Sequence, residues 1–106
     1  MDRATALRLH EAMLLTRVTE ERLVMLYRQG AALGRVYRSM GQAATACATA
    51  LALGPEDVIA PLIRNLGSML VRGVTPEEMF LQYLGRAKGP TGGREHNNHF
   101  GGVGRG

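Results

Sequence analysis

The sequence is poor in the residues that mark several common protein classes. It has one cysteine, Cys47, in 106 residues, so an internal disulfide is excluded. It has no Trp, and only 5% of its residues are aromatic. No apolar run is long enough to cross a membrane, and the start lacks the apolar stretch of a signal peptide. We therefore expect a cytoplasmic protein in which Cys47, set among alanines, is a small core residue.

The charged residues also lack the pattern of a nucleic-acid-binding protein. The chain has 13 Lys and Arg against 9 Asp and Glu, a net charge of +4 and a pI near 10.0. These basic residues are scattered, without a Lys/Arg run or interleaved aromatics, which argues against nucleic acid as a partner. The length allows one domain at most, with 45% hydrophobic residues for a modest core.

The first thirty residues predict one long amphipathic helix, from about Thr5 to Gln29. Asp2 or Thr5 is a suitable cap at its start, and Gly30 is a suitable stop. Its apolar face consists of Leu7, Leu14, Val18 and Met25, widened by Leu15, Leu23 and Leu26. Such a helix is about 38 Å long, which is long for a domain with a radius of gyration of about 13 Å. The length favours packing against a larger body or a partner subunit.

Three shorter helices follow. Ser39-Met40-Gly41-Gln42 fits a capping box and opens an Ala-rich helix to about Leu53. Its small residues predict burial between other elements, although plain helix propensity also explains them. A short helix over 65–72 should stop at Gly73. Thr75-Pro76-Glu77-Glu78 is the clearest capping box, and the helix it opens should end at Gly85.

The stretch from Asp57 to Gly67 is the centre of the sequence. Residues 58–60 predict a short buried strand that stops at Pro61, because proline cannot donate to a sheet ladder. Arg64 follows an apolar pair, and a guanidinium there needs an anionic partner. Ligands of sheet proteins bind beyond the carboxyl ends of strands, so Arg64 is a candidate ligand contact. A structural ion pair and a solvated arginine are the alternatives.

From Gly85 onward, glycine and proline predict irregular structure. A Gly-rich backbone with Arg86, Lys88 and Arg94 can wrap a phosphate, but a disordered tail has the same composition. His96 and His99 form an H-x-x-H pair, which without a third ligand is a weak zinc signal.

In combination, these residues resemble the amino-terminal part of the alpha subunit of the thiamine diphosphate-dependent first component of 2-oxo acid dehydrogenase complexes. From Tyr37 to His99, the spacing between the motif residues matches that of the family without gaps. The features that carry the resemblance are Gly41-Gln42, Glu56-Asp57-Val58-Ile59, Arg64 with Gly67, Arg72-Gly73, Leu84-Gly85-Arg86 and the Gly-rich segment through His99-Phe100. The long first helix, ending in Tyr27-Arg28-Gln29-Gly30, fits the same family.

The resemblance implies the amino-terminal portion of a thiamine diphosphate-binding α/β fold. Its parts would be a long helix (1–30), a helical core with a short strand (31–84) and a Gly-rich loop (85–106). The implied reaction is oxidative decarboxylation of a 2-oxo acid, with acyl transfer to a lipoyl group. The implied cofactor is thiamine diphosphate with Mg²⁺, and the implied partners are a beta subunit and the lipoyl-bearing acyltransferase.

The resemblance also assigns site residues. Arg64 contacts the diphosphate, Gly106 lies near the pyrimidine, and His99 belongs to a loop that covers the diphosphate side. Ile63 stands where the family often has a Tyr that contacts the diphosphate, and Tyr37 stands where pyruvate enzymes have a His near the substrate. Two further departures are Leu66 for a frequent His and Ala43 for a frequent Glu. The residues at 37 and 66 argue against a standard pyruvate enzyme.

The family's G-D-G motif for Mg²⁺ and the activating glutamate of the beta subunit are not found in these 106 residues. We therefore expect an amino-terminal fragment that neither binds the cofactor tightly nor catalyses by itself. The alternative function is a small helical interaction module without catalysis, which the long helix and basic tail would suit. A phosphate- or nucleic-acid-binding tail, with strongly salt-dependent binding, is the third option.

Overall fold

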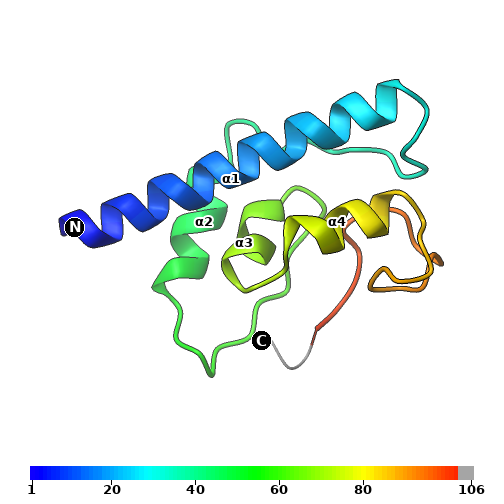
Figure 1. The fold of residues 1–106 in the computed structure, drawn as a ribbon. Helices are drawn as coiled ribbons and strands as arrows, with labels where there is room; N and C mark the ends of the chain where they lie inside the picture. Colours follow the sequence, from blue (N-terminus) through cyan, green and yellow to red (C-terminus); the bar gives the residue numbers. More distant parts are fainter. Residues whose placement is uncertain (103–106) are drawn as a thin grey trace.

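The described part of the chain forms four helices, three of which enclose one small core. The computed structural model describes residues 1–102 of the chain. The helices are α1 (Arg3–Arg28), α2 (Ala43–Ala52), α3 (Leu66–Val71) and α4 (Pro76–Tyr83). In Figure 1, α1 lies across the other three helices, with α2 under its first half and α4 under its second half. The mostly helical character predicted from the sequence is confirmed within this range.

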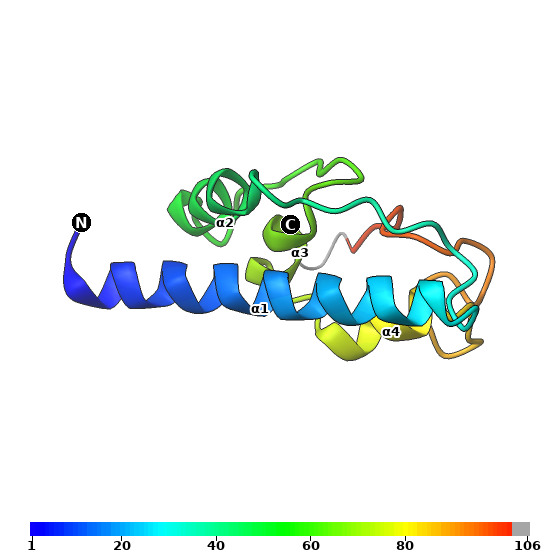
Figure 2. The same cartoon turned by 90° about the horizontal axis from the view of Figure 1, so that it is seen from above.

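Helix α1 is a single element along the whole molecule, as predicted. The Asp2 carboxylate caps it by accepting from the Thr5 amide at 2.8 Å. Gly30, with φ of +77°, continues the chain beyond its end in a conformation that glycine adopts readily. The 26 residues match the longest dimension of the molecule, 42 Å. After this end, the connector 29–42 runs back alongside α1 (Figure 2).

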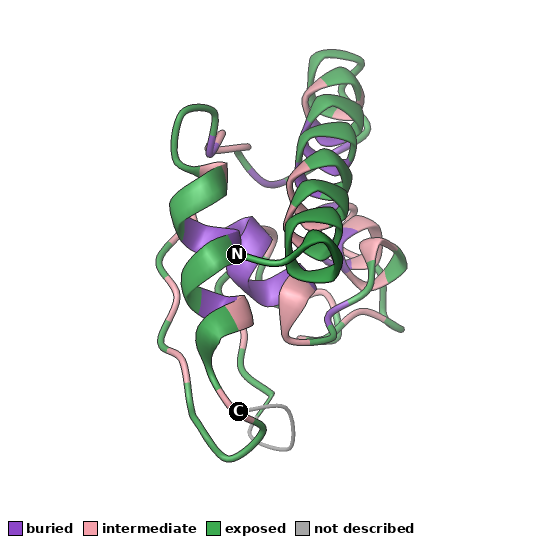
Figure 3. Ribbon diagram, turned by 90° about the vertical axis from the view of Figure 1, so that its left-hand side faces the viewer, coloured by how far each residue is buried: buried purple, intermediate pink, exposed green. Residues whose placement is uncertain are grey.

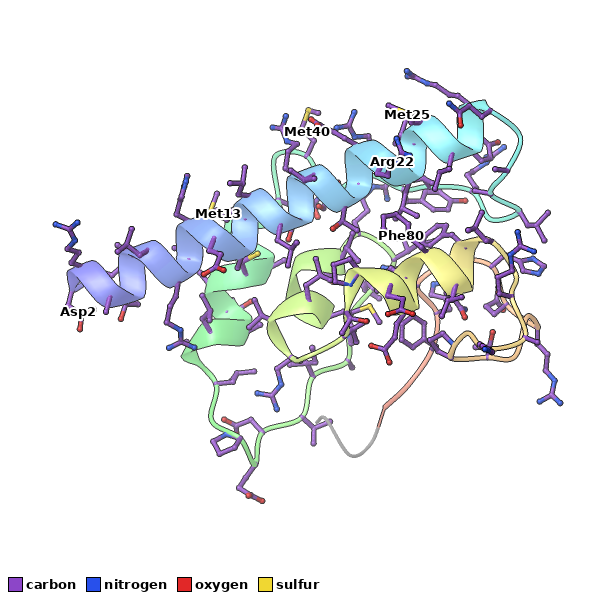
Figure 4. The ribbon with its side chains drawn as sticks, viewed as in Figure 1. Asp2, Met13, Arg22, Met25, Met40 and Phe80 are labelled. Atoms are coloured by element: carbon purple, nitrogen blue, oxygen red, sulfur yellow. The ribbon has the colours of Figure 1, made fainter. Side chains whose placement is uncertain are left out.

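Only part of the apolar face predicted for α1 belongs to the core: Leu23 is buried in it and Leu26 packs against it. Leu7, Leu14, Val18 and Met25 are each about half exposed. The buried residues of α1 are instead Thr16, Thr19, Glu20 and Leu23. Figure 4 shows Arg22 and Met25 along the outer edge of α1, whereas Phe80 of α4 lies beneath the helix. The prediction was wrong for the four exposed residues, because the buried side of α1 also has to provide a close backbone approach and hydrogen bonds.

The close approach occurs where α1, α2 and α3 meet. A Cβ added to Gly67 of α3 would lie 2.6 Å from the Cys47 sulfur and 3.1 Å from the Thr16 hydroxyl oxygen. Cys47 is fully buried and, as predicted, is a core residue. Burial raises the pKa of its thiol, which opposes use as a nucleophile. Only small side chains allow this packing.

Helix α2 differs from its prediction in two ways. It begins at Ala43, and no side chain caps it, because the Ser39 hydroxyl bonds to Glu20 instead. One face of α2 is buried, through Ala46, Cys47 and Ala50. Its other face is exposed, so the prediction of burial between elements holds for one side only (Figure 3).

Helix α4 follows its prediction closely. Thr75 and Glu78 form the capping box, with the Thr75 amide donating to the Glu78 carboxylate at 2.8 Å. Gly85, with φ of +65°, lies just beyond the end of the helix. The core between α1, α3 and α4 consists of Leu23, Ala32, Leu66, Met69, Leu70, Val74, Met79 and Tyr83.

The strand predicted near 58–60 is wrong. Within residues 1–102 there is no β-strand, and Val58 is 78% exposed. A strand needs a neighbour to satisfy its backbone groups, and the described chain offers none there. Residues 85–102 contain neither helix nor strand, in agreement with the sequence. No helix in the described range has both the length and the apolar character required to span a membrane.

Candidate functional site

Arg64 lies at the tip of a tight turn that leads into α3. The Leu62 amide donates to the Asn65 side-chain oxygen at 2.8 Å, and the Asn65 amide donates to the Leu62 carbonyl at 2.9 Å. These two reciprocal bonds close the turn and leave Ile63 and Arg64 at its tip. Asparagine suits this place because its short amide can bond to the nearby backbone. The turn therefore presents Arg64 outward.

The structure brings Arg64 together with Tyr37, two of the residues singled out by sequence. The guanidinium carbon of Arg64 lies 5.5 Å from the centroid of the Tyr37 ring. A cation over an aromatic face gains about 0.5–1 kcal/mol at an exposed site. Arg64 is exposed, and no carboxylate within residues 1–102 forms an ion pair with it. The alternative of a structural ion pair is therefore not observed in this range.

The other predicted site residues are placed separately. Ile63 is half-buried, and its carbonyl accepts from the Asn98 side-chain amide at 2.9 Å. His99 is exposed, and its backbone amide donates to the Asn97 side-chain oxygen at 3.0 Å. His96 makes a 3.0 Å hydrogen bond with the Gly93 carbonyl through its ring. No group of three metal-ligating side chains occurs within residues 1–102. Gly106 lies outside the described residues.

A buried carboxylate, which the sequence reading missed, holds the connector that carries Tyr37. Glu20 of α1 is 3% exposed. It accepts the Ser39 hydroxyl at 2.6 Å and the Ser39 amide at 2.9 and 3.0 Å. Bonds to an ionised group are stronger than neutral ones, which explains why Ser39 binds Glu20 rather than capping α2. Glu20 follows Thr16 by four residues and precedes Leu23 by three, so the three residues lie on one face of a helix. That spacing was the signal from which its burial could have been predicted.

Tyr83 of α4 lies in the same buried region. Burial and the nearby charge of Glu20 raise the pKa of the Tyr83 phenol to about 12, and a hydrogen bond from the Asn98 backbone opposes this rise. The phenol thus stays neutral at physiological pH. Glu20, Tyr83 and Asn98 connect α1, α4 and the Gly-rich segment.

The arrangement around Arg64 is suited to binding an anion. It offers a fork of exposed N–H donors on a short turn, with an aromatic ring beside it, and such a guanidinium matches phosphate oxygens bidentately. Two open grooves lie elsewhere. One of about 420 Å³ adjoins Met13, Leu14 and Met40, and one of about 410 Å³ adjoins α2 and residues 59–61. Neither is lined by Arg64 or Tyr37.

Three known proteins are similar to this chain in sequence. The chain is 34% identical over 98 residues to the 2-oxoisovalerate dehydrogenase subunit alpha of Bacillus subtilis, covering 91% of the chain and 29% of that protein. Identity to the mitochondrial 2-oxoisovalerate dehydrogenase subunit alpha 1 of Arabidopsis thaliana is 34%, over 91% of the chain and 20% of that protein. The pyruvate dehydrogenase E1 component subunit alpha of Acholeplasma laidlawii is 30% identical, over 84% and 26% respectively.

The chain thus spans 20–29% of the length of these curated relatives. No solved structure matches it significantly. The family model described as "Dehydrogenase E1 component" matches residues 10–103, which include α1 from His10, the Arg64 turn and most of the Gly-rich segment. Since this match covers nearly the whole sequence, the chain belongs to the dehydrogenase E1 component family.

Proposed function

We propose that the chain forms part of the alpha subunit of a thiamine diphosphate-dependent 2-oxo acid dehydrogenase and that Arg64 binds the diphosphate. The supporting observation is an exposed arginine on a closed turn, beside Tyr37, without an acid partner among the described residues. An uncompensated cation held in this way fits a phosphate group. Family membership supports thiamine diphosphate as that anion, and the exposed position of Arg64 beside Tyr37 supports Arg64 as its contact.

Thiamine diphosphate, when bound, supplies the chemistry that releases carbon dioxide from a 2-oxo acid. The proposed contribution of this chain is to bind and orient the cofactor. The guanidinium of Arg64 would donate to phosphate oxygens, and the two Leu62–Asn65 bonds close the turn that carries it. Tyr37 covers one side of the guanidinium. We propose no magnesium ligand among these residues. The acyl group is proposed to pass to a lipoyl group of the acyltransferase component.

A beta-type subunit is the proposed partner of this chain. The support is the outer face of α1, where Leu7, Leu14, Val18 and Met25 are about half exposed. Large apolar side chains exposed along one side of a helix are typical of protein interfaces. The same face favours the alternative function, a helical interaction module without catalysis. Cofactor binding distinguishes the two.

The test is calorimetric titration of thiamine diphosphate with Mg²⁺ into the complete natural polypeptide that carries these residues, purified with its beta-type subunit. Arg64→Ala should weaken binding by about 2 kcal/mol, or about 30-fold, because a charged hydrogen bond is lost. Arg64→Lys should weaken it less, since the charge remains but the fork is lost. Arg8→Ala, at an exposed position of α1, is the matched control and should bind normally. Absence of binding by the intact assembly would favour the interaction module.

A further inference from the structure

The Gly-rich segment 85–102 is folded back against the rest of the chain, although it has no regular secondary structure. A Cβ at Gly34 would lie 1.3 Å from the His96 carbonyl oxygen, so the segment touches the connector at a point where only glycine fits. The Thr91 hydroxyl donates to the Gln82 side-chain oxygen at 3.0 Å and accepts from the Glu95 amide at 3.0 Å. These contacts fix the path of the segment toward the Arg64 turn.

Asn98 is the residue of this segment that reaches the turn. It is 5% exposed, and its side-chain nitrogen donates to the Ile63 carbonyl at 2.9 Å across 35 residues of sequence. That carbonyl belongs to the peptide unit that joins Ile63 to Arg64. Because a peptide unit is planar and rigid, a bond to this oxygen fixes the direction in which the chain enters Arg64.

Packing alone does not account for the Asn98 amide, because half of it is unsatisfied. Its side-chain oxygen is buried, with no hydrogen-bond partner in the described structure. An unpaired buried acceptor is costly, and an apolar side chain of similar size would avoid that cost. The donor half is satisfied only by the Ile63 carbonyl. This contact is therefore the one polar interaction of the side chain that the structure shows.

The Arg64–Tyr37 pair is thus held from both sides. On one side, Asn98 and Asn65 fix the turn that carries Arg64. On the other side, Glu20 fixes Ser39, two residues beyond Tyr37. We propose that Asn98 is a positioning residue, which aims the guanidinium of Arg64 at the diphosphate and couples the Gly-rich segment to that site. This inference rests on the proposed function.

The experiment is a double-mutant cycle in the assembly used above, with affinity for thiamine diphosphate and Mg²⁺ as the readout. Asn98→Leu keeps the approximate size and removes the donor. It should weaken binding about tenfold by itself, and cause no further loss when Arg64→Ala is already present, because coupled residues are not additive. Glu95→Gln, at an exposed position of the same segment that does not touch Ile63, should bind normally.

Asn98→Ser keeps a hydroxyl donor and should recover part of the affinity. It also serves as the tested variant if Asn98→Leu unfolds, which circular dichroism of each sample will show. Where Arg64→Ala does weaken binding, a normal affinity of Asn98→Leu, or an equal tenfold loss in both backgrounds, overturns the positioning role alone. If Arg64→Ala leaves the affinity unchanged, the proposed diphosphate contact is overturned, and the role of Asn98 with it.

Discussion

The two faces of α1 contrast in a way that opposes the usual rule. The inner face buries Thr16, Thr19 and Glu20 with a single large apolar residue, Leu23. The outer face exposes four large apolar residues: Leu7, Leu14, Val18 and Met25. In an isolated globular domain, the apolar stripe of a helix normally faces the core. Here three polar residues are buried beside Leu23, with Leu26 packed against the core, while the four apolar residues on the opposite side remain exposed.

The contrast shows that the residues on the inner face are determined by their shape and hydrogen bonds. Thr16 is small enough for the close approach of Gly67, and Glu20 supplies the acceptors that hold Ser39. A larger apolar residue at either position would remove these contacts. The four apolar side chains of the outer face are exposed in the described chain, so their surface is available to a partner.

The largest expected effect comes from breaking the inner face at Glu20. In the 106-residue chain, Glu20→Ala leaves the buried Ser39 amide and hydroxyl without acceptors, which should lower the free energy of unfolding by about 3 kcal/mol. Glu21→Ala is the matched control. It removes an exposed ion pair with Arg17, which should cost no more than about 0.5 kcal/mol. Urea unfolding measures both values. Equal losses in the two variants would contradict the assignment of the inner face.

A second prediction uses the charge of Glu20 on the same face. The pKa of Tyr83 is about 12 in the folded chain, above the ordinary value of 10.0. Because the folded state favours the neutral phenol, the associated stability is complete below pH 10 and is lost as pH rises toward 12. The loss across this window should be on the order of 2–3 kcal/mol. Urea unfolding as a function of pH measures it.

Two variants sharpen this test. Tyr83→Phe should lack the alkaline loss that the phenol causes. Glu20→Gln should lower the pKa of Tyr83, because a negative charge beside the phenol is removed. Ultraviolet absorbance of the tyrosinate follows this titration once the signal of Tyr27 and Tyr37, measured in Tyr83→Phe, is subtracted. A Tyr83 titration that is the same in Glu20→Gln and in the unchanged chain would show that Glu20 does not act on the phenol.

The smallest expected effect on stability comes from the outer face. Leu14→Gln with Val18→Gln should change the free energy of unfolding of the chain by no more than about 0.5 kcal/mol, because both side chains are about half exposed. The same pair should weaken association with the proposed beta-type subunit, measured by analytical ultracentrifugation. Arg8→Gln, a polar change on the same helix, should leave association unchanged. A large loss of stability in the double variant would show that the outer face already has an internal role.

Several elements of the fold were predictable because their signals are local. The capping box at Thr75 and Glu78 lies within four residues, and the structure shows the same bonds. The long first helix follows from continuous helical periodicity. The capping box at Ser39 failed because Glu20, distant in the sequence, offers a stronger acceptor. The strand near 58–60 failed because apolar residues form a strand only beside another strand.

In the candidate site, too, some features have local signals in the sequence and others depend on distant residues. Arg64 was identifiable from sequence, since an arginine after an apolar pair needs an explanation. Its neighbour Tyr37 came from the resemblance, and their contact is visible only in the structure. Asn98 gave no signal, because it contacts Ile63 across 35 residues. The role of His99 stays a prediction, as does that of Gly106.

The sequence by itself determined the helices with strong caps, the irregular Gly-rich segment and the family of this chain. These depend on neighbouring residues or on ordered motifs, which are present in the linear sequence. The tertiary structure decided which face of α1 is buried, what Ser39 binds and what surrounds Arg64. Each of these depends on competition between distant groups for space and for hydrogen bonds, and that competition takes place only once the chain has folded.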